Sequence, residues 1–390
     1  MKPYDTFKIW KDDHNSNLVF EYEGRFFDGS PAMATLIECM AVADTEENGI
    51  KKFCELHNYA VSQEVVASVL DECVKGISSQ KTKRDSTFIW SKELIPSSIV
   101  CYISRSFRCL FSHRLMCLIV AVTIVADILY MTLTPSPFLF NSYVSGVGLM
   151  VFLVMIILSS FIHELGHAAA CSRFGINSGG IGVGLYINFP VLYTDVTKVW
   201  RLPVKQRCVV NLGGVYFQSF ILLFSIIANY FYESDYLKYL ILALNMGMIL
   251  TLNPFFKFDG YWIASDLLGV GNLRQKTRDW MMSIFNKCNQ NNLSLPSRRK
   301  YIFLSYAVLS NFFFLFFFIY VIPIFLINFF NGYPSEFKML IQYVNNRISP
   351  PFALVRNILS QTVFIVFLGY WLWGMINNVI IPMLRRNLRK

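Results

Sequence analysis

The chain has 390 residues, of which 54% are hydrophobic, 16% aromatic and only 15% charged. Its mean hydropathy of +0.44 is rare for a soluble protein. The formal net charge is +10 at pH 7, but the sequence lacks the interleaving of basic and aromatic residues on a soluble face that nucleic-acid binding requires. We therefore expect a membrane protein that contacts the lipid bilayer and has no nucleic-acid partner.

Residues 1–86 have the composition of a soluble domain. Met1 to Ser16 is charged and lacks the apolar region of a signal peptide, so we expect this domain to stay in the cytoplasm. A pair of short strands precedes three helical segments, which predicts a small α+β domain resembling a winged helix. The expected elements are strands at Leu18–Tyr22 and Arg25–Phe27, a turn at Asp28–Gly29, and helices at Pro31–Met40, Gly49–His57 and Gln63–Ile77.

Residues 87–114 are expected to link this domain to the membrane. Phe88–Trp90 can pair as a strand. Leu94–Leu110 interleaves apolar and basic residues, which is typical of a segment that lies along the membrane surface.

Residues 115–390 are expected to form a helical membrane domain. A bilayer-spanning helix needs about 20 apolar residues, and six runs approach or exceed that length. They are Leu115–Leu133, Val144–Ile162, Val209–Phe231, Leu237–Leu252, Tyr301–Phe330 and Thr362–Met383. The fourth run is short, and the fifth is long enough to require tilt or a break near Pro323.

The distribution of basic residues predicts the orientation of these spans. Positive charges gather before the first span, between the second and third, between the fourth and fifth, and after the sixth, whereas Thr134–Tyr143 has none and Tyr232–Tyr236 is acidic. Cytoplasmic loops carry the excess of Lys and Arg. We therefore expect a multi-pass protein with both termini in the cytoplasm.

The most informative motif is His163-Glu164-Leu165-Gly166-His167, at the end of the second apolar run. Residues four apart lie on one helix face, so both histidines can bind one Zn²⁺ while Glu164 lies beside the water on the metal. Ionisable residues in an apolar segment are costly and mark functional sites. The motif therefore predicts a hydrolytic metal site within a membrane helix.

A third protein ligand is needed, and a carboxylate is favoured, because the other three histidines lie before or at the start of the first span. Asp259 is the strongest candidate, since Pro254 breaks the helix just after the fourth span and Gly260 permits a tight turn. Asp195 and Asp266 are the fallback ligands and are otherwise expected to support the site. Glu233, Asp235 and Glu336 fall on the opposite side of the membrane, and Asp279 lies in a basic soluble loop.

The segment Gly175–Trp200 is rich in glycine and aromatic residues, which favours a hairpin near the site. An extended substrate could add to its edge as a further strand; the alternative is an ordinary cytoplasmic hairpin. Candidate contacts to substrate or transition state are Gly182, Tyr186, Asp195 and Asn253, the last of which is equally well explained as a helix-end hydrogen bonder.

Two separated motifs, the HExxH sequence and Asn253-Pro254…Asp259-Gly260, resemble the site-2 protease family of intramembrane zinc metalloproteases over roughly residues 140–270. Cys171–Gly175, Tyr193–Asp195, Trp200 and Asp266-Leu267 narrow the resemblance to its bacterial branch of peptide zinc metalloproteases, associated with ribosomally made peptides. The Gly-Pro of that family's third span is replaced here by Gly213-Gly214, which leaves the roles of Asn211 and Gln218 open. The N-terminal domain resembles PqqD-type modules that bind leader peptides.

The resemblance implies a mainly α, six-span membrane metalloprotease in the bacterial cytoplasmic membrane, with Zn²⁺ held by His163, His167 and Asp259 and with Glu164 as the general base. Its substrate would be a ribosomally made precursor peptide or a membrane-anchored regulator. Two other classes remain open. One is a non-catalytic immunity, sensing or export partner with a structural metal, and the other is a metal transporter, against which the absence of acids and histidines in the fifth span argues. The lone Asp127 in the first span is expected to be a hydrogen-bonded structural acid.

Overall fold

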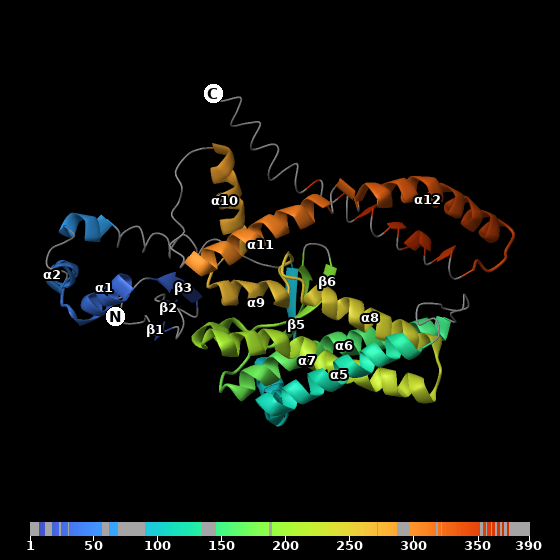
Figure 1. Ribbon diagram of the computed structural model, residues 1–390, viewed down its shortest axis with the longest axis horizontal. Coiled ribbons are helices and arrows are strands. Elements are labelled where there is room, and N and C mark those ends of the chain that lie inside the picture. Colours follow the sequence, from blue (N-terminus) through green and yellow to red (C-terminus); the bar gives the residue numbers. More distant parts are fainter. Residues whose placement is uncertain are drawn as a thin grey trace. The chain divides into compact units, whose positions relative to one another are not determined.

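The computed structural model describes residues 8–11, 18–22, 25–29, 31–56, 62–68, 90–134, 146–186, 189–270, 272–286, 297–316, 319–320 and 322–351, with scattered positions from 354 to 373. The described residues form two compact units (Figure 1). The first unit draws on Met1–Pro135, Met155–Glu233 and Tyr239–Leu293, and the second on Ser136–Val154, Ser234–Lys238 and Ser294–Lys390.

The N-terminal region begins with an antiparallel sheet of β1 (Lys8–Lys11), β2 (Leu18–Tyr22) and β3 (Arg25–Gly29), in that order. The expected turn at Asp28–Gly29 is wrong, because Asp28 pairs with Val19 and Gly29 pairs with Leu18. Because Gly29 pairs with Leu18, the first residue of β2, β3 stays extended through Gly29. It therefore ends almost at the start of α1.

Two helices follow, α1 (Pro31–Val42) and α2 (Glu46–Leu56), and residues 63–68 are also helical. The side chain of Phe20 on β2 packs against α1, and a second cluster joins α1 and α2 to Val66. The remainder of the helix expected over Gln63–Ile77 lies outside the described residues. The order of β2, β3, α1 and α2 agrees with the expectation, whereas β1 was not expected. The winged-helix assignment stays a prediction.

A second three-stranded sheet has the order β4 (Trp90–Ile95), β5 (Ile181–Tyr186) and β6 (Phe189–Thr194). The hairpin expected in Gly175–Trp200 is therefore present as β5 and β6. Of the strand expected at Phe88–Trp90, only Trp90 is described, and the observed strand continues to Ile95. Leu94 thus belongs to a strand, and the expected surface segment is reduced to α4 (Ser97–Ser106) and the short helix η2 (Arg108–Phe111).

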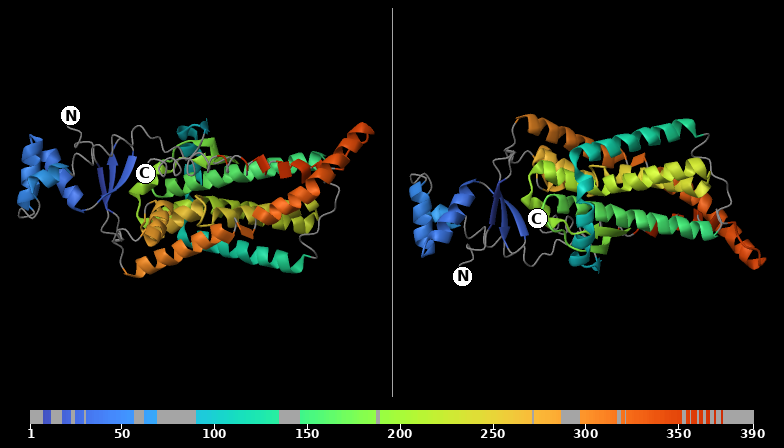
Figure 2. Two further views of the ribbon diagram at one scale, coloured as in Figure 1. Left: turned by 90° about the horizontal axis from the view of Figure 1, so that it is seen from above. Right: turned by 90° about the horizontal axis from the view of Figure 1, so that it is seen from below.

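The core of the first unit is formed by long helices that lie side by side in all views (Figures 1 and 2). They are α5 (His113–Leu133), α6 (Gly146–Arg173), α7 (Val204–Phe231) and α8 (Asp235–Thr251), of which the first residues of α6 and α8, up to Val154 and Lys238, are assigned to the second unit. Leu165 and Ala169 on α6 pack with Tyr216 and Phe217 on α7 in one buried cluster. The expected second span ends at Ile162, but the helix continues to Arg173, so the HExxH motif lies inside α6.

Among the described residues, three helices are long and apolar enough to cross a membrane: His113–Leu133, Met150–Arg173 and Val204–Phe231. α8 has only 17 residues. The expected fifth span is divided between α11 (Ser297–Phe316) and α12 (Ile322–Asn345), with α12 beginning next to Pro323. Most of the sixth lies outside the described part of the chain. Six spans therefore remain a prediction.

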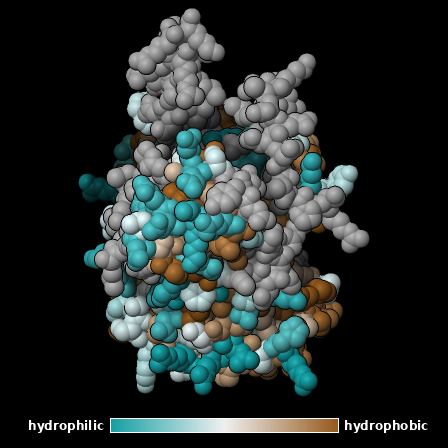
Figure 3. Space-filling model, turned by 90° about the vertical axis from the view of Figure 1, so that its left-hand side faces the viewer, coloured by the Kyte–Doolittle hydropathy of each residue, from teal (hydrophilic) through white to brown (hydrophobic). Residues whose placement is uncertain are grey.

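The outward side of α5 is apolar, since Leu118, Val122, Val125 and Leu129 are each 46–60% exposed. Apolar side chains exposed in this number along one helix are typical of a surface that lipid covers. By contrast, many of the described residues on the face drawn in Figure 3 are hydrophilic, with smaller hydrophobic patches between them.

Candidate metal centre

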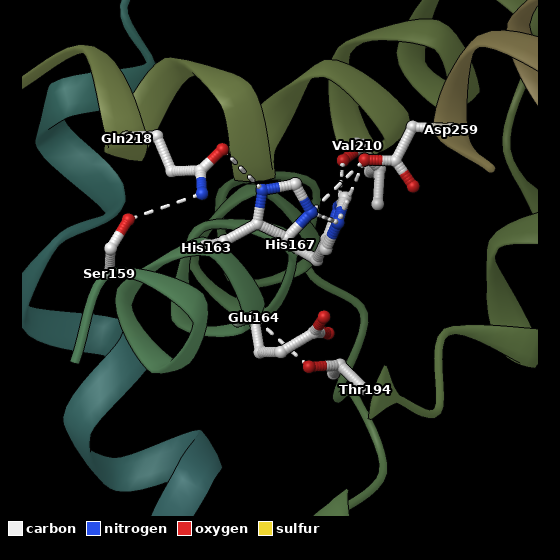
Figure 4. Close-up of polar contacts among 8 residues, drawn as sticks. All are labelled: Ser159, His163, Glu164, His167, Thr194, Val210, Gln218 and Asp259. Atoms are coloured by element: carbon white, nitrogen blue, oxygen red, sulfur yellow. Dashed lines mark hydrogen bonds and ion pairs between the residues drawn. The ribbon is translucent and has the colours of Figure 1, made fainter. Parts of the chain in front are cut away.

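Three side chains from two helices converge on one point (Figure 4). His163 and His167 stand on consecutive turns of α6, and Asp259 is the first residue of α9 (Asp259–Leu268). The two Nε2 atoms are 3.1 Å apart, and Asp259 Oδ2 is 3.2 Å from that of His163 and 3.3 Å from that of His167. These are the three ligands expected from the sequence, and the structure brings them together.

Asp259 reaches the histidines because the chain folds back after α8. Asn253 Oδ1 accepts a hydrogen bond of 2.8 Å from the Phe255 N–H, which closes a tight turn around Pro254. Gly260 is then pressed against the end of α8, where a Cβ would lie only 2.1 Å from the Leu252 carbonyl oxygen. Only glycine permits this approach, and it delivers the neighbouring carboxylate to α6.

Contacts behind the rings fix the orientation of both imidazoles. The His167 Nδ1–H donates to the Val210 carbonyl oxygen at 2.8 Å, and the His163 Nδ1–H donates to Gln218 Oε1 at 3.2 Å. Both acceptors belong to α7. With the proton on each Nδ1, the lone pair of each Nε2 faces Asp259, which is the form of histidine that binds a metal.

The position of α7 against α6 depends on a pair of glycines. A Cβ on Gly166 would lie 2.2 Å from the Gly213 carbonyl oxygen, so the helix backbones are in contact there. One residue further along α7, a Cβ on Gly214 would lie 2.4 Å from Nε2 and Cε1 of His163. Gly214 therefore provides the space that the His163 ring occupies.

The donor set fits a zinc ion. Asp259 Oδ2 is buried and has no hydrogen-bond partner among the described residues. Three atoms that all carry lone pairs repel one another at 3.1–3.3 Å unless a cation lies among them. Ligand atoms bound tetrahedrally to Zn²⁺ at about 2.0–2.1 Å are about 3.3 Å apart.

Glu164 lies beside the histidine pair and is only 8% exposed. Its carboxylate is directed towards β6, close to Thr194 (Figure 4). The Thr194 hydroxyl donates to the backbone carbonyl of Glu164 at 3.0 Å, which attaches the end of β6 to α6. The base expected from the motif and the strand expected near the site are thus adjacent.

A cavity of about 400 Å³ lies between β6, η3 (Thr197–Arg201), α7 and α9. Two residues that line the cavity lie next to residues of the candidate metal centre. Thr194 binds the Glu164 backbone, and Asn211 follows Val210, the acceptor for His167. Tyr193, Trp200 and Trp262 form aromatic parts of its wall.

The other candidate acids are held elsewhere. Asp266 accepts hydrogen bonds from Arg207 Nε at 2.9 Å and Asn211 Nδ2 at 3.3 Å, in a buried ion pair. Asp195 accepts from the backbone N–H and hydroxyl of Thr197. Neither belongs to the three-residue cluster.

Asp127 on α5 accepts a hydrogen bond of 2.9 Å from Asn245 on α8. This contact agrees with the expectation of a hydrogen-bonded acid between helices. Asp127 is also absent from the His163, His167 and Asp259 cluster.

The remaining expected contacts have mixed positions. Gly182 is enclosed in the sheet, where a Cβ would lie 2.7 Å from both the Tyr193 ring and the Lys92 carbonyl oxygen. Tyr186 ends β5, opposite Phe189, and its side chain lies outside the described part of the structure. Asn253 uses its oxygen to close the turn, as its alternative interpretation proposed. Their contacts to a substrate remain predictions.

The sequence did not reveal the residues that orient the histidines. Gln218 and Gly214 are visible in it as a polar side chain and a second glycine within an apolar span, but their target is unspecified. The Val210 carbonyl carries no sequence signal, because every residue has one.

One curated relative supports this chemistry. The chain is 24% identical over 135 residues to the protein named "Putative peptide zinc metalloprotease protein YydH" from Bacillus subtilis (strain 168). The matched residues make up 34% of this chain. The chain spans about half the length of that relative, 54%. No family model and no solved structure matches the chain. The comparison therefore relates the chain, at low identity, to a protein named as a zinc metalloprotease.

Proposed function

We propose that this protein is an intramembrane zinc metalloprotease that hydrolyses a peptide bond near the cytoplasmic face of a bacterial membrane. The observation that carries the proposal is the convergence of His163, His167 and Asp259 beside the buried Glu164. A purely structural metal site needs no base next to its metal. Three helices long enough to cross a membrane, one of which carries both histidines, support the location.

In this proposal, His163, His167 and Asp259 would hold a zinc ion, which would polarise the scissile carbonyl and lower the pKa of the attacking water. Glu164 accepts the proton that water loses and passes it to the nitrogen of the leaving amine. The Asn253 side chain contributes a hydrogen-bond donor to the developing oxyanion. The outcome is one peptide bond broken, one water consumed, and a free carboxylate and amine.

The substrate is expected to bind in an extended form. A helix buries its peptide bonds in its own hydrogen bonds, so it must unwind before water reaches them. In the sheet as described, β6 has β5 on one side and no strand on the other. A peptide added along β6 would end beside Glu164, because Thr194 attaches that strand to it. Asp195 and the aromatic wall of the cavity would then contact its side chains.

We further propose that the substrate is either a ribosomally made precursor peptide or a membrane-anchored regulator. The N-terminal domain, with its small sheet and helices, would bind the leader segment of a precursor. The topology expected from the basic residues would put this domain on the same cytoplasmic side as the hairpin and the metal centre. The domain would thus recognise one part of the peptide while the membrane domain cuts another.

The experiment is a comparison of two bacterial strains, one producing the unchanged protein and one producing Glu164→Gln. Mass spectrometry of cell peptides should show uncut precursors accumulating in the variant strain and their two fragments in the other. Equal peptide patterns, with zinc bound in both proteins, would favour a non-catalytic partner instead. Addition of the accumulated peptide to purified protein in detergent then tests cleavage directly.

A further inference from the structure

Gln218 of α7 is a polar side chain that joins the two long helices directly behind a proposed metal ligand (Figure 4). Its Oε1 accepts from the His163 Nδ1–H at 3.2 Å, and its Nε2 donates to the Ser159 hydroxyl oxygen at 3.2 Å. Ser159 lies one turn before His163 on α6 and is 2% exposed. The three residues therefore form a partly buried chain, Ser159–Gln218–His163, in which Ser159 is buried.

We infer that Gln218 is a positioning residue that sets the affinity of the centre for a divalent cation by fixing the ring nitrogen through which His163 binds it. The inference rests on the proposed metal centre and goes beyond it, because it concerns how the ligand is held. It assigns a role to the residue of α7 whose function the sequence left open.

The argument begins with the two tautomers of a neutral imidazole. A proton on Nε2 would point at Asp259 and the neighbouring ring, and would remove the lone pair that a cation needs. An acceptor opposite Nδ1 favours the other tautomer, and Gln218 Oε1 supplies one. His167 obtains the same bias from a backbone carbonyl, which no side-chain substitution removes. The bias on His163 depends on a side chain and can be tested by substitution.

Ser159 contacts the amide of Gln218, and Gly214 leaves space for the ring of His163. An amide that turned over would place its NH₂ group against the Nδ1–H of His163, two donors facing each other. The Ser159 oxygen accepts from the NH₂ group in the observed orientation. On the other side, Gly214 leaves room for the ring, since any Cβ there would lie 2.4 Å from it. The observed contacts therefore favour one ring position and the tautomer with the proton on Nδ1.

The test compares zinc and cobalt binding among variants of the full-length protein in detergent. Gln218→Met keeps an unbranched side chain of similar length and removes the acceptor. We expect its dissociation constant for Zn²⁺, measured by competition with a chelator, to rise about 10–100-fold. We also expect the visible absorption of bound Co²⁺ to shift, because the ligand geometry changes. Gln206→Met, the same substitution near the start of α7, is the matched control.

Three further variants separate positioning from folding. Gln218→Glu retains an acceptor, so we expect it to bind zinc at least as tightly as the unchanged protein. Ser159→Ala should weaken zinc binding, but by less than Gln218→Met. Ser160→Ala should leave zinc binding unchanged, because the Ser160 hydroxyl donates to the Ile156 carbonyl of its own helix.

The outcomes distinguish this inference from the metal centre itself. If Gln218→Met binds zinc as tightly as Gln206→Met with an unchanged cobalt spectrum, the positioning role is overturned while the centre stands. If Gln218→Met cannot be purified, weaker zinc binding by Gln218→Glu than by the unchanged protein overturns it equally. Failure of the unchanged protein to bind either metal overturns the centre and this inference together.

Discussion

The backbones of Gly166 and Gly213 are in direct contact where α6 crosses α7. A Cβ on Gly166 would lie 2.2 Å from the Gly213 carbonyl oxygen, and one on Gly213 would lie 2.7 Å from that of Gly166. This contact brings Val210, Gly214 and Gln218 of α7 to the two histidines of α6. The candidate metal centre is therefore built on a helix crossing that only residues without a side chain permit.

Gly166→Ala is expected to destabilise the protein. The obstructing atom belongs to the backbone, so it cannot move away by side-chain rotation, and overpacking of this kind costs about 1–3 kcal/mol. Thermal unfolding in detergent should show a lower midpoint than that of the unchanged protein. Gly247→Ala on α8 is the control, because nothing lies within 4 Å of its added Cβ. An equal midpoint for both variants would contradict the close crossing.

Gly214→Ala should weaken zinc binding more than it destabilises the fold. Its added Cβ meets the His163 ring, which can turn away, but only by leaving its position opposite Asp259. We expect about 10–100-fold weaker zinc binding, by analogy with the loss of other groups that orient ligands. Chelator competition measures it, again with Gly247→Ala as the control. Unchanged affinity would show that the ring has more room than the structure indicates.

Glu164→Gln should stop proteolysis while zinc remains bound. The substitution removes the proton acceptor, which contributes about 10²–10⁴-fold to rate, and keeps the shape of the side chain. Cleavage of an identified substrate and metal content of the purified protein are measured together. Glu233→Gln, at an exposed position beyond α7, should leave both unchanged. Undiminished cleavage by Glu164→Gln would remove Glu164 from the mechanism.

Asp259→Ala should lose bound zinc. The carboxylate is the third member of the cluster, and removing one of three protein ligands leaves two histidines to hold the ion. Elemental analysis of the purified protein measures the zinc content. Asp195→Ala removes the carboxylate that instead accepts hydrogen bonds from Thr197, and it should retain zinc. Full zinc content in Asp259→Ala would mean that another carboxylate is the ligand.

The contribution of Glu21 to stability should depend on pH. Burial raises the pKa of this carboxyl, but hydrogen bonds from Arg201 and Trp10 together with nearby positive charge lower the pKa by more than burial raises it. The folded-state pKa therefore lies below the ordinary value of 4.5. A lowered pKa stabilises the fold above that ordinary value, and the stabilisation disappears as pH falls through the folded-state pKa. Arg201 is partly exposed, so the effect is about 1 kcal/mol or less.

The corresponding experiment follows thermal unfolding of Glu21→Gln and the unchanged protein from pH 7 down to pH 3. The unchanged protein should have the higher midpoint at pH 7, and the difference should shrink below about pH 4.5, the ordinary pKa of the group. Glu38→Gln, at an exposed position on α1, serves as the control. A difference that stays constant over this range would contradict the role of the Glu21 charge.

Local chemistry explains which parts of this protein the sequence predicts well. The HExxH spacing places two histidines on one helix face whatever the tertiary structure, and Pro254 and Gly260 mark the turn that delivers Asp259. Glycine and aromatic residues of Gly175–Trp200 favour a hairpin for the same local reason. The sequence was less reliable at boundaries, because the pairing of β3 with β2 extends through Asp28–Gly29, where composition alone favours a turn.

The sequence by itself determined the apolar runs of membrane-spanning length, the identity of the candidate ligands and the presence of a neighbouring acid, because each follows from composition or from spacing along the chain. Only the tertiary structure decided how the ligands are held. Gln218 and the Val210 carbonyl act across a helix crossing, and Gly214 matters through the space that it leaves for a ring on another helix. Such relations depend on distances between segments that are far apart in sequence, and no local pattern encodes them.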